Sequence, residues 1–424
     1  MIRLQAALLS AFFASILLVG LPAPVLAENT KNLDPALREF AVQLLAEHPA
    51  IRAAESEVEA AKAHARGQGQ PLYNPELGIG YEDVGDEEKT KELGLSQTVD
   101  LWGKRSARYG VAEAELSAAN ARLAIVRKTL LADLLKALSG YEVAKSTLAI
   151  ASERVKLNQG FVELAERRYK AGDLTQTDLL TAKLTFAEAQ AAESTAMADF
   201  SRSEEQLLAI TGGKLPPALL SESQPPEDTP SPETVVAETL PELQVSAAEV
   251  EAARSRVRVA RKNRYPDPTL GFSIGEQKTF EPLMPKNSQT VIGLRLSIPL
   301  PVRNTYNAEV DAAGANEITL EQNRRNLRRQ ITARLEASHR RYMAARAAWT
   351  QWEQQGAAPL EEQRTLLQRL FESGEINAVD YIIQLNQTFT TESAGIELRG
   401  QLWATWFDWL EASASLGEWM ENIQ

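Results

Sequence analysis

The sequence has no cysteine among its 424 residues, which excludes a disulfide framework and a cysteine-linked lipid anchor. Positive charge is also scarce, because 45 Lys and Arg residues oppose 57 Asp and Glu residues, for a net charge of −12. This balance argues against a nucleic-acid partner, which would require a basic surface. The three histidines His48, His64 and His339 stand far apart, and the chain has no H-E-x-x-H, G-x-S-x-G or phosphate-loop pattern. We therefore predict no enzymatic activity, no cofactor and no metal site.

Long apolar runs are missing after residue 27, since no later segment approaches 18 uncharged apolar residues, and we expect no transmembrane helix there. The first 27 residues differ. Arg3 precedes an almost uninterrupted apolar stretch over 6–21, and Val25-Leu26-Ala27 forms a small-residue cleavage site. Residues 1–27 are therefore predicted to be a secretory signal peptide. The alternative, an uncleaved membrane anchor, is weakened by the shortness of the run.

Proline is absent between Glu76 and Leu215, although the chain contains 20 prolines. Since proline is excluded from helix interiors, this region can hold long helices. Residues 104–170 predict one helix of about 100 Å, followed by a return helix over 175–211. Two seams repeat every seven residues along the first helix: Leu134, Tyr141, Leu148, Val155, Val162 and Tyr169, and Ala137, Ala144, Ala151, Asn158 and Ala165. Two seams imply neighbours on two sides, which favours a stave of a closed helical barrel over an isolated antiparallel coiled coil.

The chain contains the same unit twice. Asn74-Pro75 has a counterpart in Asp267-Pro268, and Gly94-Leu95 has one in Gly293-Leu294, in unchanged order. Such a repeat indicates duplication. We expect a first copy over 28–214, a proline-rich linker over 215–235 and a second copy over 236–424.

The second copy predicts its own pair of long helices, over residues 304–372 and 376–419. The first of these should pause at 356–359, where glycine and proline occur together. Trp403, Trp406 and Trp409 lie three residues apart on the second, and we interpret them as core aromatics rather than a ligand cage.

Four short segments alternate between apolar residues and small or polar ones, which is the period of β-strands. They are residues 75–83, 92–100, 268–275 and 290–298, two in each copy. This alternation is typical of transmembrane strands, with the apolar face toward lipid. Because four strands cannot close a membrane barrel, several chains would each contribute four. A small soluble sheet packed against the helices is the alternative.

These residues resemble the TolC family of outer-membrane efflux proteins. The resemblance rests on Asn74-Pro75-Glu76-Leu77, on Leu101-Trp102-Gly103-Lys104-Arg105 and on Arg168 to Leu174, and it extends over both copies. Within the family, the sequence is most similar to the outer-membrane factors of cobalt–zinc–cadmium resistance pumps. The fold implied is mixed and mainly α: a homotrimer whose twelve-stranded β-barrel crosses the outer membrane of a Gram-negative bacterium and continues as a periplasmic α-helical barrel.

The resemblance also implies partners and site residues. The trimer would be the exit duct of a tripartite pump, joined through a periplasmic adaptor to an inner-membrane RND-type transporter. The adaptor would dock at the periplasmic tip, on Arg168, Tyr169, Gly172, Asp178, Leu179, Leu180 and Gly374. In the second hairpin Leu370-Phe371 and Tyr381-Ile382 replace the Arg-Tyr and Leu-Leu pairs, so the two tips differ. Asp178 and Asp380 hold equivalent positions and would form an acidic constriction in a trimer. The alternative for each is a charge in the first turn of a helix.

Two other functional interpretations remain open at this point. A periplasmic coiled-coil scaffold or adaptor would also use long helical hairpins, and a duct of this kind could serve drugs or organic solutes instead of divalent heavy-metal cations. The duct would conduct passively, with energy supplied by the partner pump.

Overall fold

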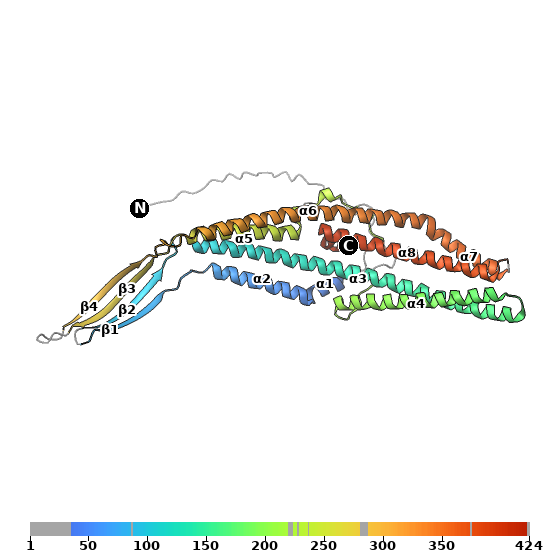
Figure 1. Ribbon diagram of the computed structural model, residues 1–424, viewed down its shortest axis with the longest axis horizontal. Helices are drawn as coiled ribbons and strands as arrows, with labels where there is room; N and C mark the ends of the chain where they lie inside the picture. Colours follow the sequence, from blue (N-terminus) through green and yellow to red (C-terminus); the bar gives the residue numbers. More distant parts are fainter. Residues whose placement is uncertain are drawn as a thin grey trace, which may run out of the picture.

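The computed structural model describes residues 35–85, 88–218, 224–226, 229–235, 237–279, 287–373 and 375–421. The predicted signal peptide, residues 1–27, and the tip residue Gly374 lie outside the described residues. The molecule is long and narrow, with a four-stranded sheet at one end and helices along the rest, as Figure 1 shows. Among the helices of the described ranges, none combines the length and the hydropathy that a membrane span requires.

The sheet consists of β1 (Glu76–Asp83), β2 (Glu88–Thr98), β3 (Thr269–Thr279) and β4 (Asn287–Ser297), antiparallel and in that order. One row across the four strands is Leu77, Leu95, Phe272 and Leu294. Because side chains alternate along each strand, the apolar ones gather on one face. They are exposed there, Leu294 to 87%. No helix packs on this face to cover its apolar side chains within the described residues.

Three strands are longer than the sequence predicted. β2 begins at Glu88 rather than at 92, β3 continues to Thr279 rather than to 275, and β4 begins at Asn287 rather than at 290. The added residues are charged or polar, which is typical of loops. They are nevertheless paired, and the register sets Lys91 of β2 directly opposite Glu276 of β3. Opposite charges in such positions stabilise a sheet, so the strands extend beyond their apolar stretch.

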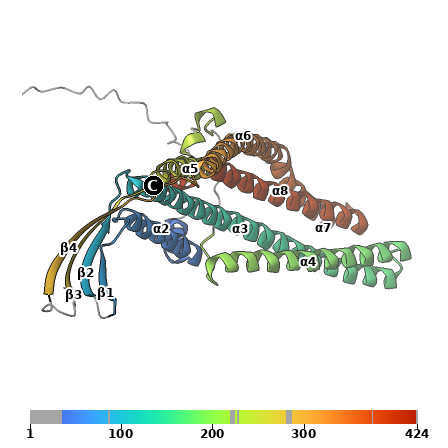
Figure 2. The ribbon, with the colours of Figure 1, turned by 60° about the vertical axis from the view of Figure 1, so that its left-hand side comes forward.

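Four helical segments lie next to the sheet (Figures 1 and 2). They are α2 (Pro49–Gln68), the first part of α3 (Lys104–Ala171), α5 (Pro241–Asn263) and the first part of α6 (Asn307–Trp352), with α1 (Pro35–Glu47) preceding α2. The helices α2 and α5, which are counterparts in the two copies, were not predicted from the sequence. The sequence did contain a sign of both helix starts, because each helix begins with a proline at its first position. At that position the N–H that proline lacks would have no partner within the helix.

The far half of the molecule consists of two helical hairpins (Figure 2). α3 runs for 68 residues, and α4 (Gln176–Thr211) returns along it. The second hairpin is formed by α7 (Ala358–Glu372) and α8 (Ala378–Ser413). α3 packs against α4 and also against α8, so the long helix has neighbours on two sides, as its two seams predicted. Small buried residues such as Ala165 and Ala189 allow the close approach.

A π-helical turn, Glu353–Ala357, joins α6 to α7 where the sequence predicted a pause. The side chain of Trp352 lies against α8, where a Cβ atom added at Gly395 would come within 2.2 Å of its ring. An added Cβ at Gly356, inside the π turn, would lie 3.0 Å from the indole Nε1 of the same tryptophan. The two glycines make room for Trp352, and the π turn carries the helix past it without a break.

The main core lies where the two copies meet. Trp403, Trp406 and Trp409 of α8 are at most 3% exposed, which confirms their interpretation as core aromatics. They pack in one cluster with Leu134 of α3 and Tyr342 of α6. Helices from both copies therefore share this core, and the copies form one body.

Two helix ends differ from the prediction. α6 begins at Asn307 rather than at 304, directly after Tyr306, whose φ of 57° is left-handed. α8 ends at Ser413 rather than at 419, because Ala414 also has a φ of 57°, and the short helix α9 (Leu416–Glu421) follows. Neither position is a glycine, so composition gave no sign of the left-handed residue.

Candidate functional site

The first hairpin tip is closed by Gly172 at the end of α3. Its φ of 85° is left-handed, its N–H donates to the carbonyl oxygen of Tyr169, and the N–H of Asp173 donates to the carbonyl oxygen of Arg168. These two hydrogen bonds define a Schellman motif, which satisfies carbonyl groups that the helix end would otherwise leave unpaired. Arg168 and Tyr169 are exposed beside this turn, and both are therefore free to meet another protein.

The return helix α4 begins with a capping box. The hydroxyl of Thr175 accepts a hydrogen bond from the Asp178 N–H at 3.2 Å, and it donates to Asp178 Oδ2 at 2.7 Å. The same carboxylate accepts from the Thr175 N–H at 3.3 Å. Asp178 thus stabilises the N-terminus of α4, with its charge at the positive end of the helix dipole. Of the two predicted leucines, Leu180 is exposed and Leu179 is half-buried against the second hairpin.

The second tip repeats this chemistry with different residues. The side chain of Asn377 caps α8 by accepting from the Asp380 N–H at 2.8 Å, and it donates to Asp380 Oδ2 at 2.6 Å. Phe371 of α7 and Tyr381 of α8 stack with ring centroids 4.4 Å apart. Where the first tip has an exposed Arg-Tyr pair, the second has an aromatic stack.

The structure joins the two tips through an apolar cluster. Phe161 of α3 packs there with Ile382 and Phe389 of α8, and Leu179 and Phe371 lie at its edge. Asp178 and Asp380 do not share a hydrogen bond within the described residues, and each instead caps its own helix. The sequence predicted a helix from residue 175, but it gave Thr175 and Asn377 no capping role, although a Thr or Asn three residues before an Asp marks a helix start.

A buried polar pair lies between the two hairpins. Asn158 of α3 is 1% exposed and faces Asn386 of α8, with the two amides exchanging hydrogen bonds of 3.3 and 3.4 Å. Arg154 donates from Nε to Asn386 at 2.6 Å and from a terminal nitrogen to Glu188 of α4 at 2.9 Å. A slip of α8 along α3 would leave these amides unpaired, so the pair fixes the register of the hairpins.

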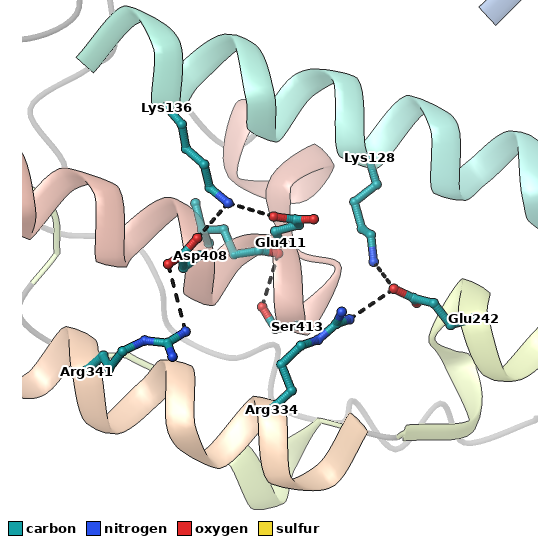
Figure 3. A network of polar contacts seen from close by, with 9 residues as sticks. Lys128, Lys136, Glu242, Arg334, Arg341, Asp408, Glu411 and Ser413 are labelled. Carbon is teal, nitrogen blue, oxygen red and sulfur yellow. Dashed lines mark hydrogen bonds and ion pairs between the residues drawn. The ribbon is translucent and has the colours of Figure 1, made fainter. Parts of the chain in front are cut away.

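A network of ion pairs links the two copies beside the tryptophan core (Figure 3). Lys136 of α3 contacts Asp408 at 2.6 Å and Glu411 at 2.8 Å, both on α8. Burial alone would lower the pKa of Lys136, but the hydrogen bonds that its ammonium group donates to these two carboxylates outweigh burial and raise that pKa. Arg341 of α6 also contacts Asp408, at 3.8 Å. The network therefore joins three helices.

The second part of the network centres on Glu242 of α5, which contacts Lys128 of α3 at 2.5 Å and Arg334 of α6 at 3.1 Å (Figure 3). Burial would raise the pKa of Glu242, but the hydrogen bonds from Lys128 and Arg334 outweigh it and lower that pKa. The Lys128 side chain is only 8% exposed. The pair is accordingly an element of structure rather than a surface contact.

A further buried ion pair lies where the sheet meets the helices. Lys104 Nζ at the start of α3 contacts Asp267 Oδ2 before β3 at 2.9 Å, and the Tyr73 hydroxyl donates to the same oxygen at 2.7 Å. Trp102 stacks on Tyr265 with ring centroids 4.8 Å apart. Within the described residues, no group of three or more His, Cys, Asp or Glu side chains is placed to hold a metal ion.

The sequence was compared with known protein families, and it matches one of them. Residues 41–213 and 236–407 match the outer membrane efflux protein family, one match in each copy. Residues matched in this way cover most of the chain.

Two curated relatives come from metal-resistance systems. The chain is 30% identical to the cobalt-zinc-cadmium resistance protein CzcC of Cupriavidus metallidurans over 57% of this chain and 57% of that protein. The match thus spans little more than half the length of this relative. It is 28% identical to the nickel-cobalt-cadmium resistance protein NccC of Alcaligenes xylosoxydans xylosoxydans, over 71% of this chain and 68% of that one.

Solved structures share the fold. The open state of the MtrE outer membrane channel of Neisseria gonorrhoeae superposes with a TM-score of 0.73 at 16% identity. The superposition covers 92% of this chain and 96% of that channel. The mainly helical fold with a short four-stranded sheet is therefore the fold of an outer membrane channel, as predicted.

Proposed function

Since this chain belongs to the outer membrane efflux protein family, which acts at the outer membrane, we propose that it forms the exit duct of an efflux pump. The observation that carries the proposal is the exposed apolar face of the sheet, joined to helices long enough to cross an aqueous compartment. α3 alone, at 68 residues, extends for about 100 Å. β2, β3 and β4 have 11 residues each, the length of a transmembrane β-strand.

The working unit would be a homotrimer. β1 and β4 each leave one edge of backbone N–H and C=O groups unpaired in the described chain. Such an edge is not tolerated in lipid, because every exposed backbone group there costs several kcal/mol. Pairing β4 of one protomer with β1 of the next removes both edges, and three chains would close a twelve-stranded barrel. Their helices would continue it as a periplasmic helical barrel.

The partners would meet the hairpin tips. Arg168, Tyr169 and Leu180 are exposed beside the Gly172 turn and offer a cationic, an aromatic and an aliphatic side chain to a periplasmic adaptor. The adaptor would connect the duct to an inner-membrane RND-type transporter, which supplies the energy. Because Phe371 and Tyr381 stack on each other at the second tip, that tip would present a different surface to the adaptor.

The substrate class would be divalent heavy-metal cations. Two matched relatives are named for resistance to such metals. The chain carries a net charge of −12, which favours cations in a shared lumen. With no cation site built from the described residues, the duct would conduct these ions without binding them closely. Drugs or organic solutes are the alternative substrates, and zinc or cobalt tolerance in cells that express the chain separates the two.

The acidic constriction can be tested by single-channel conductance in a planar bilayer. We propose that Asp178 and Asp380 from three protomers narrow the periplasmic end. Asp178→Asn/Asp380→Asn removes the charges and keeps a side-chain oxygen for capping, so cation selectivity should fall while the protein stays folded. Glu163→Gln, an exposed change on α3, should leave selectivity unaltered. Unchanged selectivity in the double variant would place the constriction elsewhere. Failure of the wild type to insert or conduct would favour a soluble periplasmic scaffold instead.

A further inference from the structure

A groove of about 450 Å³ crosses the apolar face of the sheet near the hairpin ends of the strands. One row of its lining is apolar and consists of Ile79, Leu93 and Ile274 on β1, β2 and β3. The next row, two residues nearer the hairpin ends, is Tyr81, Lys91 and Glu276. The groove therefore passes from hydrocarbon side chains to charged ones over one step of about 7 Å along the strands.

The charged residues at this end of the sheet lie on both faces, and the lysines lie on only one of them. The register puts Lys89, Lys91 and Lys278 on the apolar face. Glu82 and Glu92 lie on the opposite face, since side chains alternate along a strand. The lysines of the described strands thus all share the face that bears the groove.

The three lysines share this face with two acidic residues, Asp83 and Glu276. Lys89 contacts Asp83 at 3.0 Å, and Lys278 contacts Glu276 at 3.3 Å. Lys91 is exposed and lies opposite Glu276, whose carboxylate is already in contact with Lys278. Three lysines thus oppose two carboxylates on this face of the described strands, which leaves one net positive charge per chain beside the apolar row.

The position of this charge relative to the membrane follows from the proposed function, on which the present inference rests. If the helices lie in the periplasm, the hairpin ends face the outside. The Lys91 row then lies at the level of the lipid headgroups of the outer leaflet, next to Tyr81, an aromatic of the kind found at membrane interfaces. A lysine at the headgroup level attracts anionic lipid.

We propose that this groove binds a phosphate-bearing lipid of the outer leaflet. Its acyl chains would lie along Ile79, Leu93 and Ile274, and its phosphate would contact Lys91. A free phosphate ion would not use the apolar half of the groove, so the occupant is a lipid. Each protomer of the duct would hold one such lipid.

The test is native mass spectrometry of the full-length protein in detergent, titrated with lipid A, a glucosamine lipid with two phosphates, and with its dephosphorylated form. The wild type should bind lipid A more tightly than the dephosphorylated form. Lys91→Gln should bind lipid A about fivefold more weakly, the equivalent of one headgroup contact, and should lose most of the preference. Arg295→Gln is the matched control, because it removes the same charge from the opposite face of the sheet. Equal lipid A binding by wild type and Lys91→Gln, or an equal loss in Arg295→Gln, would overturn the proposal.

The same preparations separate this inference from the proposed function. Conductance in a planar bilayer reports whether the protein is a duct at all. A wild type that conducts but does not distinguish the two lipids contradicts only the lipid site. A wild type that does not insert removes the membrane setting and with it the reason for a lipid to bind.

Discussion

At the scale of single residues, Gly172 and Gly160 offer a matched comparison on one helix. A Cβ added at either position would meet no atom within 4 Å, so space does not distinguish them. Only Gly172 is left-handed, with a φ of 85°. Gly172→Ala should therefore destabilise the tip by about 1 kcal/mol, and Gly160→Ala, inside α3, should stabilise it by about the same amount. Thermal unfolding followed by circular dichroism measures both changes.

The Gly172 turn also provides the test of docking at this tip. Gly172→Val adds a β-branched side chain to the same left-handed position, so it should weaken capture of the adaptor while the protein still assembles. Gly160→Ala should capture the adaptor as well as the wild type does. Normal adaptor capture and full resistance in the Gly172→Val variant would contradict the docking assignment.

Residue patterns predicted the tip turn, and they gave the local role of its acids, a charge in the first turn of a helix, only as the alternative. Gly172 between two long apolar repeats predicts a helix end, because few other residues adopt a left-handed φ. The Asp178 carboxylate satisfies a capping box within its own helix start, which a motif search for Thr-x-x-Asp would have found. Whether it also lines a constriction depends on other chains, which no local pattern encodes.

At the scale of secondary-structure elements, the duplication predicts the register between protomers. Leu95 of β2 pairs with Phe272 of β3 within the chain. The counterpart of Leu95 is Leu294 on β4, and the counterpart of Phe272 is Ile79 on β1. If the contact between protomers copies the contact between the repeats, Leu294 should lie opposite Ile79 of the next protomer.

Disulfide cross-linking checks this register cleanly, because the chain has no cysteine of its own. Ile79→Cys/Leu294→Cys should form covalent trimers on mild oxidation, visible on a non-reducing gel. Gly80→Cys/Leu294→Cys serves as the control, since its two thiols would lie on opposite faces of the sheet and should stay unlinked. Efficient cross-linking of the control pair alone would show a register shifted by one residue.

The elements themselves were only partly predictable from the sequence. The alternation of apolar residues predicted where the strands lie. It did not predict their polar ends, because these depend on pairing between strands, such as that of Lys91 with Glu276. Likewise, a glycine and a proline predicted that the helix is interrupted after α6. The π turn that takes its place depends on Trp352 and on Gly395, a residue of another helix, so nearby sequence could not reveal it.

At the scale of the whole molecule, the ion pairs of Glu242 should make the stability of the contact between the two copies fall in acid. The pKa of Glu242 is lowered in the folded protein, because its hydrogen bonds to Lys128 and Arg334 outweigh burial. Its contribution is therefore complete above the unfolded pKa of about 4.3 and is lost as the pH falls through the lower folded value. Lys136 has the opposite dependence: its raised pKa keeps the stabilisation below about pH 10.4 and loses it in stronger base.

Glu242→Gln should lower the stability at pH 7 by about 3 kcal/mol, because it leaves the buried Lys128 without a full counter-charge. Glu336→Gln is the matched control: Glu336 contacts Arg340 at 3.5 Å on the surface of α6, and its loss should cost less than about 1 kcal/mol. Thermal unfolding of both variants and the wild type between pH 3 and 8 measures the difference. The wild type and Glu242→Gln should converge as the pH falls through the lowered folded pKa of Glu242, because the carboxylate becomes protonated there. A constant gap across this range would show that packing of the Glu242 side chain, rather than its charge, joins the two copies at this point.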